Sequence, residues 1–165
     1  MKKMWILFLV ALLLSGCVSR ETFETVDDAN AVPAVAMEYE LVIDLPEGAA
    51  QQTVAGEMDV LYICDNYLMS VQTMNGGDLG RTVKQVTGLR REAVTLVEKK
   101  QNGFRSWYCA WTTTGEQNHQ VCRAVILDDG TRHHAVTVMA EQAVAGELTE
   151  QWMQVLGSAT LVSTG

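Results

Sequence analysis

Short turn signals that separate β-rich runs constrain the fold of this chain more than any other feature. Asp65-Asn66, Asn102-Gly103, Gly115-Glu116 and Asp129-Gly130 each stand between segments rich in β-branched and aromatic residues. Such dipeptides favour the tight turns of antiparallel hairpins. The spacing predicts one early hairpin and a later four-stranded antiparallel meander. The expected strands are residues 57–64, 67–74, 93–99, 105–114, 119–127 and 133–140.

Two helices are predicted around the meander. Asp78 is a good N-cap residue, apolar residues follow it at helical spacing, and Gly88 favours termination. A second helix is expected over residues 146–157, where four apolar side chains share one face. The other expected segments are a strand at 38–44, a loop at 49–56 and a short closing extension at 160–162. The chain therefore predicts one α+β domain, residues 37–163, in which two helices cover an antiparallel sheet.

The N-terminal segment has the features of an export signal. Two lysines precede an unbroken apolar run at residues 4–14, which is shorter than the roughly 20 residues needed to span a hydrocarbon core. The run leads into Leu14-Ser15-Gly16-Cys17, which resembles the lipobox of bacterial lipoproteins. That resemblance implies a signal peptide at 1–16 and a lipidated Cys17, on the extracytoplasmic side of the bacterial cell membrane. An ordinary secretory signal with an incidental cysteine is the alternative, and it also implies export.

The acidic charge of the chain limits its partners. The chain carries 20 acidic and 12 basic residues, a formal net charge of −8, and cleavage after residue 16 would remove two lysines and bring the charge to −10. Nucleic-acid binding needs a basic surface and is not expected. An acidic surface also adheres poorly to an anionic bilayer, so membrane attachment is expected through the lipid on Cys17. Residues 17–36 lack clear periodicity and are predicted to be a flexible tether.

Three points along the chain match a known architecture. They are Leu45-Pro46-Glu47-Gly48 after the first strand, the strand pair before the first helix, and the segment 152–158 near the end. This order resembles the PsbP-like α/β sandwich, a family that includes photosystem-associated proteins and many bacterial envelope lipoproteins, over residues 37–162. Members of that family are mostly non-catalytic. The resemblance therefore implies a binding or stabilising role and carries over no catalytic residues.

Two cysteines are expected to face each other across a hairpin. If Gly115-Glu116 is a two-residue turn, Cys109 lies opposite Cys122. Because an exported protein can keep such a bond, a Cys109–Cys122 disulfide is predicted, with two reduced core thiols as the alternative. Cys64 has no partner by sequence and is expected to be a small buried residue. A reactive thiol or an intermolecular bridge is the alternative for Cys64.

Three histidines call for a test of a metal site. If Asp129-Gly130 forms the turn, His134 lies opposite Val125, and His119 lies roughly 20 Å away along the strands. The adjacent His133 and His134 point to opposite faces of one strand. We therefore expect no shared metal site, and nothing else in the chain implies a cofactor.

Two glycine-containing loops are interpreted as structural. Asp128-Asp129-Gly130 lacks the alternating oxygen ligands of a calcium loop and is predicted to be a turn. The segment 76–80 precedes a helix, but Asp78 stands where a bound anion would lie. Capping of the helix by Asp78 is therefore predicted instead of a phosphate cradle.

Aromatic and basic residues have both a structural and a binding interpretation. Trp107 and Trp111 share a face with Cys109 and are predicted to pack in the core. The alternative is that Tyr108 or Trp111 is exposed and anchors a partner. A local basic cluster is expected to be solvated, with an acidic partner as the alternative. Its members are Arg90, Arg91, Lys99 and Lys100.

Four common catalytic motifs are absent from the sequence. There is no GxSxG, SxxK, HExxH or CxxC pattern. The expected function is a non-enzymatic, membrane-anchored envelope lipoprotein that binds or stabilises another envelope protein. A small-ligand-binding or hydrolytic extracytoplasmic domain is the alternative.

Overall fold

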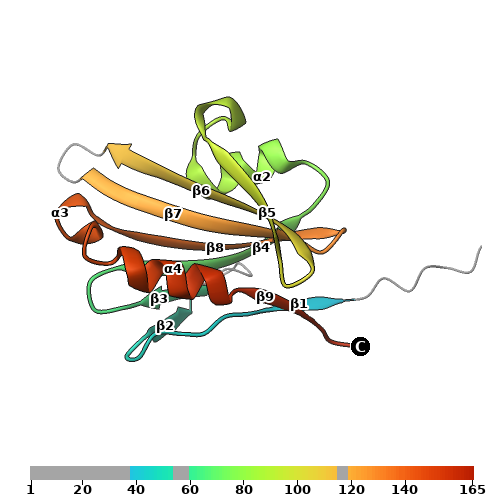
Figure 1. Cartoon of the computed structure of the whole chain (residues 1–165), viewed down its shortest axis with the longest axis horizontal. Coiled ribbons are helices and arrows are strands. Elements are labelled where there is room, and N and C mark those ends of the chain that lie inside the picture. The colour runs from blue at the N-terminus through green and yellow to red at the C-terminus, as the bar shows by residue number, and fades with distance from the viewer. Residues whose placement is uncertain (1–37, 54–59, 115–118) are drawn as a thin grey trace, which may run out of the picture. The chain divides into compact units, whose positions relative to one another are not determined.

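The computed structural model describes residues 38–53, 60–114 and 119–165 (Figure 1). The expected signal peptide at 1–16, the lipidated Cys17 and the tether at 17–36 lie outside the described residues and stay predictions. Within the described part, no helix is long and apolar enough to cross a membrane.

A seven-stranded antiparallel sheet forms the centre of the domain, in the order β2-β3-β4-β8-β7-β6-β5. The predicted hairpin corresponds to β3 and β4, and the predicted meander to β5 through β8. β4 and β8 pair from Leu68↔Met139 to Asn75↔Arg132, which joins the hairpin and the meander into one sheet. The strand bounds are β2 Ala50–Thr53, β3 Val60–Ile63, β4 Leu68–Asn75, β5 Leu96–Gln101, β6 Phe104–Thr114, β7 His119–Asp128 and β8 Arg132–Glu141.

A separate two-stranded sheet joins the two ends of the domain. β1, Tyr39–Val42, pairs antiparallel with β9, Thr160–Ser163, so the predicted closing extension is a strand. The loop predicted at 49–56 is wrong in its first part, because Ala50–Thr53 forms β2 and pairs with β3. The sequence AQQT has no apolar alternation, and only the backbone of β3 makes it a strand.

Helices cover both faces of the seven-stranded sheet (Figure 1). α2, Leu79–Thr87, begins where the Asp78 side chain accepts a hydrogen bond from Arg81 N, and ends at Gly88 with φ of 73°. A 3-10 turn, η2, Arg91–Ala93, follows it and delays the start of β5. The predicted last helix is two helices, α3, Gln142–Ala145, and α4, Thr149–Ser158. The predicted α+β class and helix-covered sheet are confirmed.

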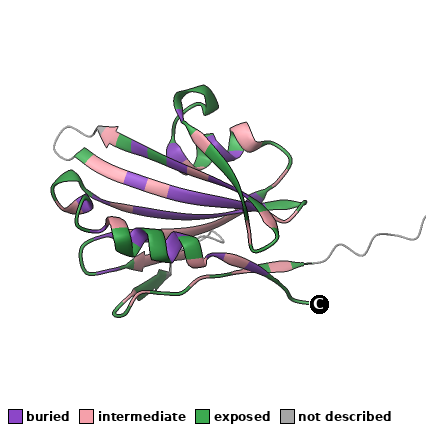
Figure 2. Cartoon of the chain, in the orientation of Figure 1, coloured by how far each residue is buried: buried purple, intermediate pink, exposed green. Residues whose placement is uncertain are grey.

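The sheet separates two hydrophobic cores, and its central strands are the most buried elements (Figure 2). Trp107 and Trp111 lie with Val83 of α2 in one core, so the predicted core role of both tryptophans is confirmed. Trp152 of α4 is fully buried in the other core and meets Tyr67 edge-to-face. Burial of such large apolar side chains on both faces is the main stabilising contribution.

The β6–β7 register differs from the prediction by two residues. Thr114 pairs with His119, so four residues, not two, separate the paired positions. Cys109 therefore lies opposite Ala124, and Cys122 lies opposite Trp111. The predicted direct opposition of Cys109 and Cys122 is wrong, and in the structure both are free, buried thiols instead of a disulfide. The diagonal offset separates their β-carbons beyond the distance that a disulfide spans.

The β7–β8 register is also shifted by two residues. Asp129 N donates to Arg132 O, so the central residues of the turn are Gly130 and Thr131. Gly130 has a φ of 93°, which a residue with a side chain rarely adopts. His134 consequently lies opposite Leu127 instead of Val125.

Candidate functional site

His133 occupies a buried position on the α2 face of the sheet. Its Nδ1 atom lies 2.6 Å from Oγ1 of Thr82 in α2. Its Nε2 atom lies 4.0 Å from Oδ1 of Asp128, the opposing residue in β7. The Trp107 ring meets the imidazole edge-on, with 5.7 Å between ring centroids. Burial lowers the pKa of His133, although the carboxylates of Asp128 and Asp129 oppose that shift, so the ring is neutral near pH 7.

A polar cavity of about 360 Å³ opens beside His133. On its wall, Arg105 Nε donates to Glu98 Oε1 at 2.8 Å, and Trp107 Nε1 donates to the other carboxylate oxygen at 3.3 Å. The hydrogen bond from Arg105 lowers the pKa of Glu98, which is therefore ionised. Arg91 of η2 completes the charged lining and donates one hydrogen bond to Val94 O.

His134 lies on the opposite face in a closed polar contact. Its Nδ1 atom is 3.2 Å from Thr73 Oγ1, and its Nε2 atom is 2.9 Å from Asp129 Oδ2. The other Asp129 oxygen accepts hydrogen bonds from Thr131 N, Thr131 Oγ1 and Arg132 N. Burial alone would raise the pKa of Asp129, but these hydrogen bonds, led by that of His134, lower it to about 2. The contact therefore fastens the β7–β8 turn to the strand.

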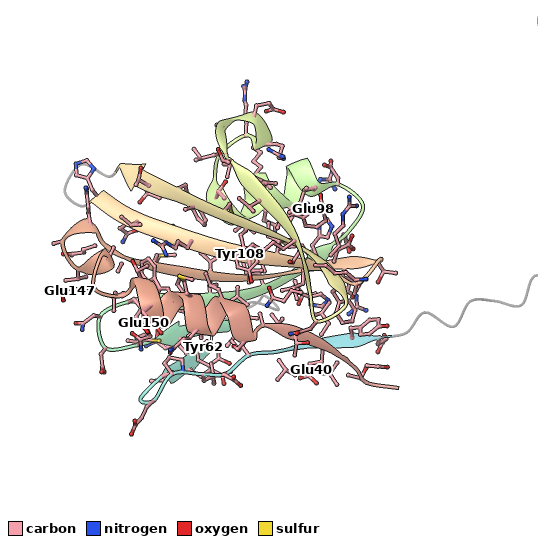
Figure 3. The ribbon with its side chains drawn as sticks, in the orientation of Figure 1. Glu40, Tyr62, Glu98, Tyr108, Glu147 and Glu150 are labelled. Atoms are coloured by element: carbon pink, nitrogen blue, oxygen red, sulfur yellow. The ribbon has the colours of Figure 1, made fainter. Side chains whose placement is uncertain are left out.

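An apolar groove lies on the α4 face, between α4 and the strands β5 and β6. Its volume is about 580 Å³. Val97 of β5 and Met153 of α4 stand on opposite sides of it and are 51% and 66% exposed. Tyr108 and Leu156 form part of the lining, and Figure 3 shows Tyr108 on the sheet beside α4. The groove thus brings exposed apolar side chains from two elements into one recess.

Two cations border the groove. Lys99 Nζ lies 4.8 Å from the centroid of the Tyr108 ring, and the Arg123 guanidinium lies 5.8 Å from the centroid of the Trp152 ring. Within the described part of the chain, neither cation forms a salt bridge, and the groove lining holds no carboxylate. The groove is therefore a local cationic area on an acidic protein.

Gln101 holds the C-terminal end of α4 against the strands. Its Nε2 atom donates toward the carbonyl oxygens of Leu156, Gly157 and Ala159, at 3.2, 3.0 and 2.7 Å. Its Oε1 atom accepts a hydrogen bond from the Tyr108 hydroxyl. These carbonyls have no intrahelical donor, since they belong to the last turn. Gln101 thus sets the distance between α4 and the floor of the groove.

The cysteines of the domain are structural thiols. Burial raises the pKa of Cys109 to about 11 and also raises the pKa values of Cys64 and Cys122. Thiols with such pKa values are protonated near pH 7 and are poor nucleophiles. Cys64 lies beside the predicted Asp65-Asn66 turn, where its N–H donates to Tyr67 O. The prediction of a small buried residue at Cys64 is confirmed.

The other residues singled out by sequence are dispersed. His119 stands at the start of β7, whereas His133 pairs with its last residue. Among the described residues, no group of three metal-ligating side chains converges. The Asp78 cap is confirmed. The basic cluster is divided, because Arg91 lines the polar cavity and Lys99 lines the groove on the other face.

The groove was not found from the sequence. Met153 lies on the polar side of α4, and Val97 alternates with charged residues in an edge strand, so each looks like a single exposed apolar residue. One sequence signal could have indicated the groove: by strand alternation, Val97, Tyr108 and Lys99 share one face of the sheet.

Comparisons with known proteins show similarity of structure. No family model and no curated protein matches the chain. A protein of Bacteroides thetaiotaomicron, solved at 1.50 Å resolution, matches with a TM-score of 0.54 and 12% identity, over 79% of this chain and 50% of that one. CyanoP, the cyanobacterial PsbP of Synechocystis, matches in its solution structure with a TM-score of 0.52 and 15% identity, over 79% of this chain and 96% of that one.

The chain has a PsbP-like fold. LpqN of Mycobacterium tuberculosis, described as involved in cell envelope biogenesis, matches with a TM-score of 0.51 and 8% identity, over 79% of this chain and 87% of that one. The chain spans about half the length of the Bacteroides protein. The TM-scores above 0.5 show a shared fold, and at 8–15% identity the similarity extends to the fold alone. The fold predicted from the element order is confirmed.

Proposed function

We propose that the PsbP-like domain is a non-catalytic binding module, anchored by a lipid on Cys17, that holds an acidic segment of another envelope protein in the groove beside α4. The observation that carries the proposal is the joint exposure of Val97 and Met153 in one recess. Exposed apolar side chains that gather in a recess with a polar rim are typical of a protein interaction site.

The cations of the groove define the chemistry of the partner. Lys99 and Arg123 border an apolar recess on a chain with a formal charge of −8. An acidic partner would otherwise be repelled by the domain, and only a local cationic area would accept it. The partner segment therefore needs apolar side chains that fill the groove and carboxylates that reach its two cations.

Other observations support the proposed location and the proposed non-catalytic role. The lipobox-like Leu14-Ser15-Gly16-Cys17 supports attachment to the outer side of the cell membrane, and LpqN, which shares the fold, is involved in cell envelope biogenesis. A non-catalytic role is supported by the protonated state of the described thiols and by the burial of Thr82 next to His133, which keeps that hydroxyl from acting as a nucleophile.

Site-specific photo-crosslinking in the native envelope tests the binding site. A photoreactive side chain at Met153 should give one specific adduct, and the same group at Val162, which is also exposed, should not. The adduct should disappear in Lys99→Glu/Arg123→Glu. Reversing the acidic residues of the captured segment to lysine should restore it in that variant. Equal crosslinking from both positions would contradict the proposal. So would an adduct that persists in Lys99→Glu/Arg123→Glu.

Membrane fractionation tests the anchor. Cys17→Ala should release the protein from the membrane, because one diacylglyceryl-linked cysteine is the proposed attachment. Cys122→Ala, a change of a buried thiol in the domain, is the matched control and should stay in the membrane fraction. Retention of Cys17→Ala in the membrane would refute the lipid anchor.

A further inference from the structure

The polar cavity beside His133 lies on the face opposite the groove and has no part in the proposed protein binding. We propose that this cavity binds a small molecule that carries a carboxylate or phosphate group and, next to it, a hydroxyl or amino donor. The lining of the cavity supplies a ring nitrogen of His133, the guanidinium groups of Arg91 and Arg105, and the carboxylate of Asp128.

His133 presents a ring nitrogen to the cavity. The residue is 2% exposed, and Thr82 engages its Nδ1 atom. Nε2 forms no hydrogen bond to the described residues, and Oδ1 of Asp128 lies 4.0 Å away from it. Polar atoms that line a cavity take water or a ligand group as their hydrogen-bond partner. A group that enters the cavity would supply that partner.

The cavity wall has more N–H donors than the protein uses. Arg105 donates a hydrogen bond from Nε to Glu98, and Arg91 donates one from a single Nη atom to Val94 O. An arginine carries five N–H donors in a fork that fits carboxylate and phosphate oxygens. Glu98 is already occupied by Arg105 and Trp107, so the charges of Glu98 and Arg105 cancel within the wall, and Arg91 supplies the remaining positive charge of the lining. The unused donors of the two arginines therefore favour an anionic group.

Asp128 sets the second requirement of the ligand. Its Oδ1 atom accepts a hydrogen bond from Gly130 N, and its side chain is 24% exposed at the cavity. A carboxylate in this position repels a simple anion but accepts a hydrogen bond from a hydroxyl or an ammonium group. The ligand must therefore combine an anion with a donor, and the cavity volume of about 360 Å³ limits it to a small molecule.

The direct test is a titration of the detergent-solubilised full-length protein, followed through the His133 ring resonances by NMR. The probes are glycerol 3-phosphate and L-serine, with sulfate as an anion without a donor and glycerol as a donor without an anion. Titration to about 10 mM detects a Kd near 1 mM. One of the first two probes should shift the resonances and bind at least tenfold more tightly than sulfate and glycerol. No shift with either probe, or equal shifts with the controls, would overturn the proposal.

Two adjacent arginines provide matched variants. Arg91→Gln removes a guanidinium from the cavity lining and should weaken binding about tenfold or more. Arg90→Gln removes the same charge from the neighbouring exposed position, which is not part of the lining, and should leave binding unchanged. Equal weakening by both variants would show a general charge effect and would contradict a built site.

A third variant separates this site from the proposed protein-binding groove. Lys99→Glu alters the groove and lies on the other face, so it should not change the affinity for glycerol 3-phosphate or L-serine. Loss of partner crosslinking with intact small-molecule binding would keep this inference valid. In the converse experiment, Arg91→Gln should lose small-molecule binding and keep its crosslink to the partner. That result would show that the cavity and the groove act independently.

Discussion

His133 and His134 are neighbours in β8, equally buried, and yet take part in different structures. Each has a threonine hydroxyl at Nδ1 and an aspartate near Nε2, Asp128 at the end of β7 for His133 and Asp129 in the following turn for His134. The Nε2-to-carboxylate distance is 2.9 Å for His134 and Asp129, but 4.0 Å for His133 and Asp128. The alternation of a strand sends the first ring to the α2 face and the second to the α4 face.

The difference between the two pairs comes from the aspartates. Asp129 belongs to the turn and binds three further donors, so its carboxylate is held against His134. Asp128 is the last residue of β7 and stays partly exposed at the cavity. The same residue types thus form a closed structural contact on one face and an open polar site on the other. The predictions below test this contrast.

The largest effect is expected for Asp129→Ala. Loss of the His134 contact and of three hydrogen bonds should lower the free energy of unfolding by about 3 kcal/mol. Asp128→Ala is the matched variant one residue earlier and should cost about 1 kcal/mol or less. Urea unfolding of both variants measures the difference, and equal losses would contradict the contrast.

Acid should destabilise the domain through Asp129. Its pKa is lowered from 3.8 to about 2 in the folded protein, so the unfolded state binds the proton first. The resulting stabilisation, roughly 2 kcal/mol, is present above pH 4 and is lost as the pH falls through about 2. Unfolding measured across this range should show the loss in the wild type but not in Asp129→Asn. A variant with the same acid dependence would exclude this origin.

Gln101→Ala should affect the α4 face alone. Removal of the amide leaves the last carbonyls of α4 without their donor and should cost about 1–2 kcal/mol. Gln151→Ala, at an exposed position of α4, should change the stability by less than about 0.5 kcal/mol. Partner crosslinking at Met153 should also weaken in Gln101→Ala, whereas the His133 ring resonances should not move. Altered His133 resonances would mean that the two faces are coupled.

The smallest effect is expected near neutral pH and arises from His133. Burial lowers the pKa of His133 below its ordinary 6.5, so the unfolded state binds a proton first as the pH falls. Stability should therefore decrease as the pH drops below about 6.5 and down to the lowered pKa. His133→Gln should remove this slope, and His119→Gln, at an exposed position, should retain it. An unchanged slope in His133→Gln would assign the effect to another group.

Local signals predicted the elements of this fold well. The cap at Asp78, the stop at Gly88 and the Asn102-Gly103 turn all act within a few residues, and each is present. Strand registers were less predictable. The Gly115-Glu116 and Asp129-Gly130 signals lie at real connections, but both registers are shifted by two residues. A two-residue shift keeps every side chain on its face, so the hydrophobic pattern cannot detect it.

Residues that are distant in sequence form both recesses. The polar cavity combines η2, β5, β6, β7 and β8, and the groove combines β5, β6, β7 and α4. Val97 and Met153 are ordinary surface residues in their own elements, and only the packing of α4 against the sheet places them together. The disulfide prediction was wrong for a related reason, because it needed the β6–β7 register and not only the spacing of Cys109 and Cys122.

The sequence by itself determined the α+β class, the order of the hairpin, the first helix and the meander, the core role of Trp107 and Trp111, and the expectation of export. These features depend on contacts between near neighbours and on alternation, which a single chain displays directly. Only the tertiary structure decided the registers, the separate roles of His133 and His134, and the two recesses. Those features depend on which backbones pair and which helix covers which strands, and the energies that select such pairings come from the whole core.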